Sequence, residues 1–203
     1  GTVDLVALRA AVVERFAATD TGVVDTAFVT TCSPLPSVRW SEPYELLRDR
    51  SDAYLALTGK RPEVFLVNLG PVEVHTARAT FAKNFFEAGG VAAISSELSE
   101  SRGFENVEDA VNDAIQSGCA LACICSSDAV YTARAAEFAE GLTAAGVSRV
   151  YLAGNPGDRR TAELAAGVNE FIHVGVNLIE VLDRALSSLE LASRTTARKE
   201  SGE

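Results

Sequence analysis

Residues 61–70, Arg-Pro-Glu-Val-Phe-Leu-Val-Asn-Leu-Gly, contain the first of five short apolar runs that decide the fold. The four later runs are residues 91–95, 120–125, 149–153 and 171–174. All are of strand length and almost continuously apolar, as is typical of strands covered by helices on both faces. The sequence therefore predicts five buried strands.

The segments between these runs have a helical period. Apolar side chains recur at every fourth position at Ala77, Phe81 and Phe85, and again at Val107, Val111 and Ile115. Residues 128–145 are rich in Ala and Glu and stop at Gly146, and a last helix carries Leu178, Leu182, Leu186 and Leu189. Alternating strands and helices predict an α/β fold: a flavodoxin-like (Rossmann-like) five-stranded parallel sheet with helices on both faces. Its ligand crevice would lie at the carboxyl ends of the strands.

The composition and net charge of the chain indicate which classes of protein it can belong to. The chain has 203 residues, of which 47% are apolar and 23% charged, so we expect a folded chain. Its net charge of -10 opposes binding to nucleic acid. The absence of a leader pattern and of a spanning apolar stretch predicts a cytoplasmic protein with no membrane partner. The chain starts at Gly1 and has no Met, so we expect a piece of something longer.

Three segments are expected along the chain. Residues 3–18 have the pattern of an amphipathic helix, residues 21–38 lack a clear period, and residues 42–58 predict a helix behind Ser41. We expect Trp40, Tyr44, Leu47 and Tyr54 to belong to an exposed arm that packs on a neighbouring chain. The predicted division is an N-terminal helix and linker arm over 1–60, an α/β domain over 61–192, and a disordered tail over 193–203.

The chain has two histidines. His75 follows the first strand, where the first turn opens the crevice, and Glu73 is placed to orient its ring for metal binding or proton transfer. The alternative is that His75 begins a helix at the surface. His173 lies in an apolar run and predicts a hydrogen-bonded core residue, while the pair Arg159-Arg160 predicts a solvated turn.

Residues 61–70 and the following His75-Thr-Ala-Arg-Ala-Thr-Phe-Ala-Lys-Asn-Phe-Phe-Glu-Ala-Gly-Gly90 resemble the cobalamin-binding-type domain of methylmalonyl-CoA mutases. Within that family they are most similar to the small subunit of the bacterial heterodimeric enzyme. Residues 38–54 resemble the segment that leads into this domain, and the resemblance covers about residues 38–190.

The resemblance implies a cobalamin motif, Asp-x-His-x-x-Gly, whose histidine is the lower cobalt ligand. Here it falls on Glu73-Val-His75-Thr-Ala-Arg78, so the histidine is kept, the carboxylate is longer, and the glycine has become arginine. Further contacts to the cofactor are implied at Ser126, Ser127 and Gly154. On the residues alone, the two serines are equally typical of a helix N-cap.

Other chemistries have less support. Cys119, Cys123 and Cys125 lack the spacing of a zinc site and predict buried thiols in a reducing compartment. The chain has neither a dinucleotide-binding nor a phosphate-binding glycine motif.

The resemblance implies a non-catalytic domain of a mutase small subunit, without activity as this chain alone, that supports the catalytic large subunit. The whole enzyme would use adenosylcobalamin to interconvert methylmalonyl-CoA and succinyl-CoA. One alternative is a functional cobalamin-binding domain with His75 as the metal ligand to cobalt. Another is a flavodoxin-like domain that binds a different small molecule.

Overall fold

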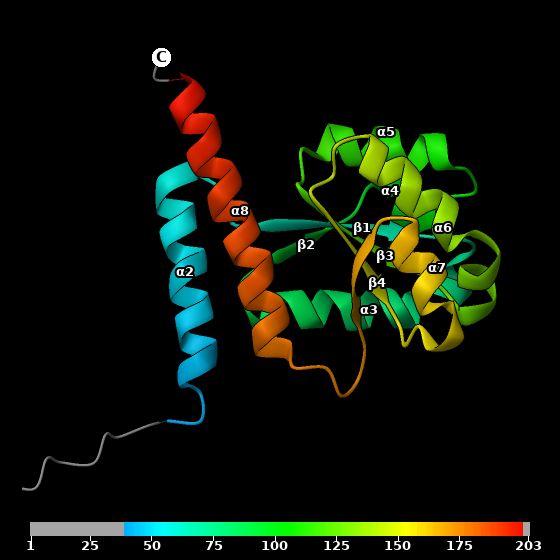
Figure 1. Cartoon of the computed structure of the whole chain (residues 1–203), viewed down its shortest axis with the longest axis horizontal. Helices are drawn as coiled ribbons and strands as arrows, with labels where there is room; N and C mark the ends of the chain where they lie inside the picture. The colour runs from blue at the N-terminus through cyan, green and yellow to red at the C-terminus, as the bar shows by residue number, and fades with distance from the viewer. Residues whose placement is uncertain (1–38, 201–203) are drawn as a thin grey trace, which may run out of the picture. The chain divides into compact units, whose positions relative to one another are not determined.

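The computed structural model describes residues 39–200, which contain one five-stranded, all-parallel sheet (Figure 1). The strands lie side by side in the order β2-β1-β3-β4-β5, which is the flavodoxin order. Their bounds are β1 Glu63–Asn68, β2 Ala92–Ile94, β3 Leu121–Cys125, β4 Arg149–Ala153 and β5 Val168–Ile172. The predicted fold class is confirmed.

Helices cover both faces of the sheet. They are α2 Glu42–Thr58, α3 Val72–Ala88, α4 Glu97–Ser101, α5 Val107–Ser117, α6 Asp128–Ala144, η2 Gly157–Arg159, α7 Arg160–Ala165 and α8 Leu178–Glu200. Alternate strand residues point to opposite faces, so Val64 and Leu66 join the core beneath α3 and α8. Phe65 and Val67 join the second core, beneath α5 and α6.

Several sequence predictions differ from the structure in detail. On α5 the buried residues are Ala110 and Ala114, whereas Ile115 is exposed, because the helix turns its small side chains toward the sheet. Ala77 is also exposed on α3. Strand β5 starts three residues before the predicted run and ends at Ile172, which leaves His173 in the loop beyond it. The short helices α4 and α7 were not predicted, since one turn of helix has too few residues to show a period.

Helix α2 packs along α8 (Figure 1). Leu47 is buried in the core shared with α8, and Arg50 of α2 forms ion pairs with Asp183 and Glu190 at 2.5 and 2.9 Å. The expectation of an arm exposed throughout is therefore wrong for residues 42–58. Trp40, however, is fully exposed.

The predictions for residues 3–18 and 21–38 lie outside the described residues. Helix α8 runs to Glu200, through most of the segment that we expected to be a disordered tail. None of the helices in residues 39–200 is long and apolar enough to cross a membrane.

Gly103 joins the loop after α4 to the carboxyl end of β1. Its φ of 72° lies in the left-handed region, and a Cβ atom there would lie 2.1 Å from the Gly70 carbonyl oxygen. The neighbouring Phe104 donates its backbone N–H to the Asn68 carbonyl at 2.7 Å. Only glycine allows the two loops to approach this closely.

We predict that Gly103→Ala lowers the free energy of unfolding by roughly 3 kcal/mol or more, because it adds a backbone clash to left-handed strain. Gly118→Ala is the matched control. Gly118 has a φ of 70° but open space around it, so the loss there should be about 1–2 kcal/mol. Urea unfolding followed by circular dichroism measures both, and equal losses would contradict the role given to the clash.

Candidate functional site

The candidate site lies at the carboxyl ends of β1, β3 and β4. His75 stands in the first turn of α3 and is only 3% exposed. Its Nδ1 lies 2.9 Å from the carbonyl oxygen of Gly70. Since a carbonyl only accepts hydrogen bonds, Nδ1 carries the proton and Nε2 of the neutral ring keeps its lone pair.

The structure does not bring Glu73 to the His75 ring. Glu73 lies exposed in the same turn of α3, and the Gly70 carbonyl is the group that orients the imidazole. The alternative prediction of a surface histidine is wrong, because the ring is packed beneath the turn.

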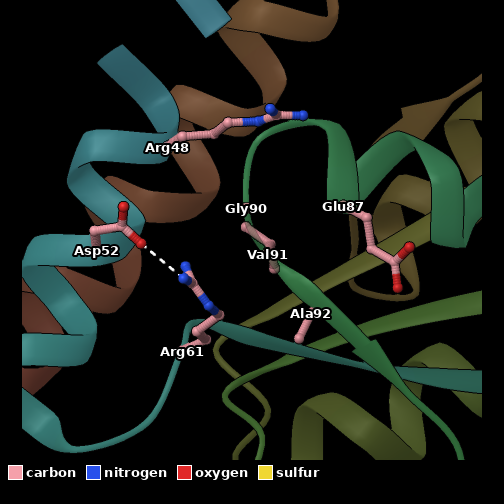
Figure 2. Close-up of a pocket in the computed structure, with 7 residues that line it drawn as sticks. All are labelled: Arg48, Asp52, Arg61, Glu87, Gly90, Val91 and Ala92. Carbon is pink, nitrogen blue, oxygen red and sulfur yellow. Dashed lines mark ion pairs between the residues drawn. The ribbon is translucent and has the colours of Figure 1, made fainter. Parts of the chain in front are cut away.

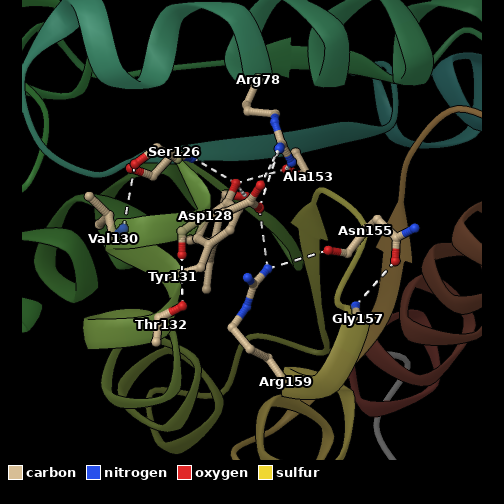
Figure 3. Close-up of polar contacts among 12 residues, drawn as sticks. Arg78, Ser126, Asp128, Val130, Tyr131, Thr132, Ala153, Asn155, Gly157 and Arg159 are labelled. Atoms are coloured by element: carbon tan, nitrogen blue, oxygen red, sulfur yellow. Dashed lines mark hydrogen bonds and ion pairs between the residues drawn. The ribbon is translucent and has the colours of Figure 1, made fainter.

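Arg78 crosses from α3 to the end of β4 (Figure 3). Its Nη1 donates to the carbonyl oxygen of Ala153 at 2.7 Å. A Cβ atom on Gly154 would lie 2.0 Å from this nitrogen, so the space in front of Gly154 is filled by the guanidinium. The absence of a side chain at Gly154 thus makes room for the Arg78 side chain.

Asp128 holds two arginines together at this end of the sheet (Figure 3). Arg78 Nη2 and Arg159 Nη2 each lie 3.3 Å from the Asp128 carboxylate. Arg159 also binds the buried carboxylate of Glu163 at 2.9 Å. Of the predicted solvated pair, Arg160 is exposed, but the prediction is wrong for Arg159, whose side chain is only 21% exposed and is held by Asp128 and Glu163.

Tyr131 lies beneath the two guanidinium groups, 5.9 Å from that of Arg78 and 5.7 Å from that of Arg159, measured to the ring centre. Its hydroxyl donates toward Ala153 O at 2.8 Å and accepts from Ser126 N at 2.7 Å. The side chain is 2% exposed, and burial raises its pKa well above the usual value of 10. Sequence analysis missed Asp128 and Tyr131, since each looks like an ordinary helix residue.

The hydroxyl groups of Ser126 and Ser127 both form hydrogen bonds with backbone groups of other residues in this chain. The Ser126 hydroxyl donates to Leu69 O at 2.8 Å and is fully buried. Ser127 is the N-cap of α6 and accepts from Val130 N at 3.4 Å. The structure therefore brings Arg78, Ser126 and Gly154 close to one network, with Ser127 at its edge.

A hollow of about 400 Å³ lies beside this network. His173 lines it together with Arg78, Gly154 and Asn155. The prediction of a core histidine is wrong, since His173 lies beyond β5, is partly exposed, and has Nδ1 2.9 Å from Val174 O.

A second hollow, of about 350 Å³, lies at the opposite, amino end of β1 and β2 (Figure 2). Arg61 pairs there with Asp52 at 2.8 Å, and Ser51 donates to Gly90 O at 2.7 Å. These contacts join α2 to the turn between α3 and β2, so we assign this hollow a structural role.

No group of three or more His, Cys, Asp or Glu side chains among the described residues is arranged to hold a metal ion. Cys123 and Cys125 are fully buried on one face of β3, as predicted. Burial raises the pKa of the Cys123 thiol well above its ordinary value, so this thiol stays protonated at neutral pH.

The chain has clear relatives among known proteins, although no protein-family model matches it. It is 42% identical over 158 residues to the methylmalonyl-CoA mutase small subunit of Streptomyces virginiae. It is 39% identical over 154 residues to the probable small subunit of Mycobacterium tuberculosis H37Rv, and 30% identical over 161 residues to that of Porphyromonas gingivalis. The chain is homologous to part of the methylmalonyl-CoA mutase small subunit.

These small-subunit matches cover 76–79% of the chain but only 24% of each of the three relatives. The chain thus spans about a quarter of their length, as a domain of the small subunit would. The resemblance predicted from residues 38–190 is confirmed.

The solved structures with a similar fold have lower sequence identity to the chain than the small subunits do. A cobalamin-binding protein from Desulfitobacterium hafniense DCB-2 has a TM-score of 0.48 and 14% identity, over 86% of this chain and 76% of that one. A CheY-like protein from Pseudomonas aeruginosa PAO1 has a TM-score of 0.45 and 17% identity, over 61% and 92%. The fold assignment therefore rests on the strand order itself.

We predict that Arg78→Ala lowers the free energy of unfolding by about 1–2 kcal/mol, because a charged donor to a backbone carbonyl is lost and Asp128 loses one partner. Arg160→Ala is the control, since Arg160 lies near the same edge over the Phe171 ring and has no role in the network. Urea unfolding should show a loss below about 0.5 kcal/mol for the control. A similar loss in both variants would contradict the assigned role of Arg78.

The stability of the domain should fall above pH 10. Burial raises the pKa of Tyr151 to about 12, so the folded chain keeps a proton that the unfolded chain releases near pH 10. Unfolding therefore becomes easier as pH rises, and the Tyr151 contribution lost by pH 12 is roughly 2–3 kcal/mol. Urea unfolding between pH 9 and 12 measures the slope. Tyr151→Phe should make the slope shallower without abolishing it, because burial also raises the pKa values of Tyr131 and Cys123. An unchanged slope in this variant would contradict the assignment.

Proposed function

We propose that the chain is the cobalamin-binding-like domain of a methylmalonyl-CoA mutase small subunit, and that it contributes to the enzyme by packing on the catalytic large subunit. The identities of 30–42% to named small subunits support the first part. The observation behind the structural role is that Arg78 fills the space in front of Gly154 at the carboxyl ends of the strands, where a cofactor would otherwise lie. The whole enzyme would interconvert methylmalonyl-CoA and succinyl-CoA, with adenosylcobalamin supplying the radical chemistry.

The crevice residues do not fit cobalamin in their present arrangement. A lower cobalt ligand must present its free nitrogen to the metal, whereas the His75 ring is 3% exposed. The space in front of Gly154 is taken by the Arg78 guanidinium, which Asp128 and Ala153 hold in place. A nucleotide tail would have to displace a partly buried, charge-assisted hydrogen bond, so we infer that this chain does not hold the cofactor.

The second candidate is a functional cobalamin-binding domain in which His75 ligates cobalt. It is favoured by the hydrogen bond from Nδ1 to the Gly70 carbonyl, which selects the tautomer of the neutral ring whose free lone pair is on Nε2. Glu73 would have to turn toward the ring, and α3 would have to move to uncover it.

Titration of the purified chain with hydroxocobalamin, followed by absorbance and calorimetry, separates these two functions. We expect no spectral change and no heat of binding. The two histidines provide matched variants, because His173 lies at the same edge of the sheet and is partly exposed. A spectral change that His75→Ala abolishes and His173→Ala keeps would overturn our proposal and establish the second candidate.

A further inference from the structure

A groove of about 590 Å³ lies along the contact between α2 and α8, and it shares no lining residue with the crevice at the carboxyl ends of the strands. Its apolar lining comes from both helices, and α2 supplies most of it. The apolar lining residues are Pro43, Leu46, Leu47, Ala53 and Ile179. Leu47 is buried at its base, but Leu46 is 58% exposed.

The apolar surface continues along α2 beyond the groove. Of the large apolar side chains that the described residues expose, half belong to α2 and the two residues before it: Trp40, Tyr44, Leu46 and Leu57. Leu46, Ala53 and Leu57 are seven and four residues apart, so they share one stripe of the helix. Leu57 is 87% exposed. An apolar stripe of this length on one helix is a mark of an interaction surface.

The rim of the groove is acidic. Three carboxylates line it, Asp49, Glu180 and Asp183, against the single guanidinium of Arg50. Arg50 is engaged by Asp183 and Glu190, and Glu180 lies 3.7 Å from Nη1 of Arg184, so Asp49 is the lining carboxylate without an ion pair among the described residues. Like charges on both sides would oppose pairing of this groove with the same groove of a second copy, whereas a basic partner would be attracted.

We propose that the α2–α8 groove binds a basic amphipathic helix of the catalytic large subunit. The helix would place apolar side chains on Leu46, Ala53 and Ile179, and a Lys or Arg side chain beside Asp49, as helices do in apolar grooves. Trp40 and Tyr44, which are exposed just before α2 and in its first turn, are of the residue types enriched where partners meet. This inference rests on the proposed function, because it names the surface through which the domain supports the large subunit.

The test is binding of the full chain to the large subunit of the same organism's mutase, measured by calorimetry at two salt concentrations. Leu46→Lys and Leu57→Lys each remove apolar contact and add repulsion toward a basic helix, so we expect about tenfold weaker binding. Ile115→Lys is the matched control, because Ile115 is 59% exposed on α5 and remote in sequence from both groove helices. Asp49→Lys should also weaken binding, and the salt dependence should fall with it.

The outcomes separate the inference from the proposed function. Binding of the wild-type chain that Leu46→Lys, Asp49→Lys and Leu57→Lys leave unchanged would overturn the assignment of this surface while the proposed function stands. No binding of the wild-type chain at all would overturn the proposed function. Unfolding temperatures serve as a second measurement: a fall of several degrees in Leu46→Lys alone would mean that this chain covers its own groove, which also overturns the inference. A dimer of the chain that Leu46→Lys dissociates would do the same.

Discussion

The carboxyl edge of the sheet is governed by the need of its backbone carbonyls for hydrogen-bond donors. Side chains of the same chain meet that need at Leu69, Gly70 and Ala153. The donors are Ser126, His75, Tyr131 and Arg78. In a flavodoxin-type sheet this edge is the usual ligand site. Here side chains of the chain itself occupy this edge. Most of them belong to α3 and α6, so their hydrogen bonds help to fix these two helices against the sheet.

The same arrangement brings charges together without leaving them unpaired. Asp128 lies between the guanidinium groups of Arg78 and Arg159, and Arg159 also forms an ion pair with the buried Glu163. An arginine at the position that the cobalamin motif gives to glycine is therefore compatible with a stable fold. The cost is the space in front of Gly154, which the guanidinium now fills.

The sequence predicted the fold better than the site. Continuous apolar runs located β1 and β4 within their observed bounds, because strands covered on both faces leave a strong pattern. The same pattern misplaced β5, since the first half of this edge strand carries two polar residues, the exposed Asn169 and the half-buried Glu170. The role of Arg78 was visible only as a departure from a motif. Its partners Asp128 and Ala153 lie 50 and 75 positions away in the sequence, and no local pattern joins residues that only the tertiary structure brings together.

The exposure of Trp40 has a practical consequence for optical work on this domain. It is the single tryptophan of the chain and lies wholly outside the core, ahead of α2. Its emission therefore already resembles that of an indole in water while the domain is folded. Intrinsic tryptophan fluorescence reports the immediate surroundings of this one residue and is nearly blind to loss of the sheet, whereas the buried rings of Tyr131 and Tyr151 make near-ultraviolet tyrosine signals the informative ones.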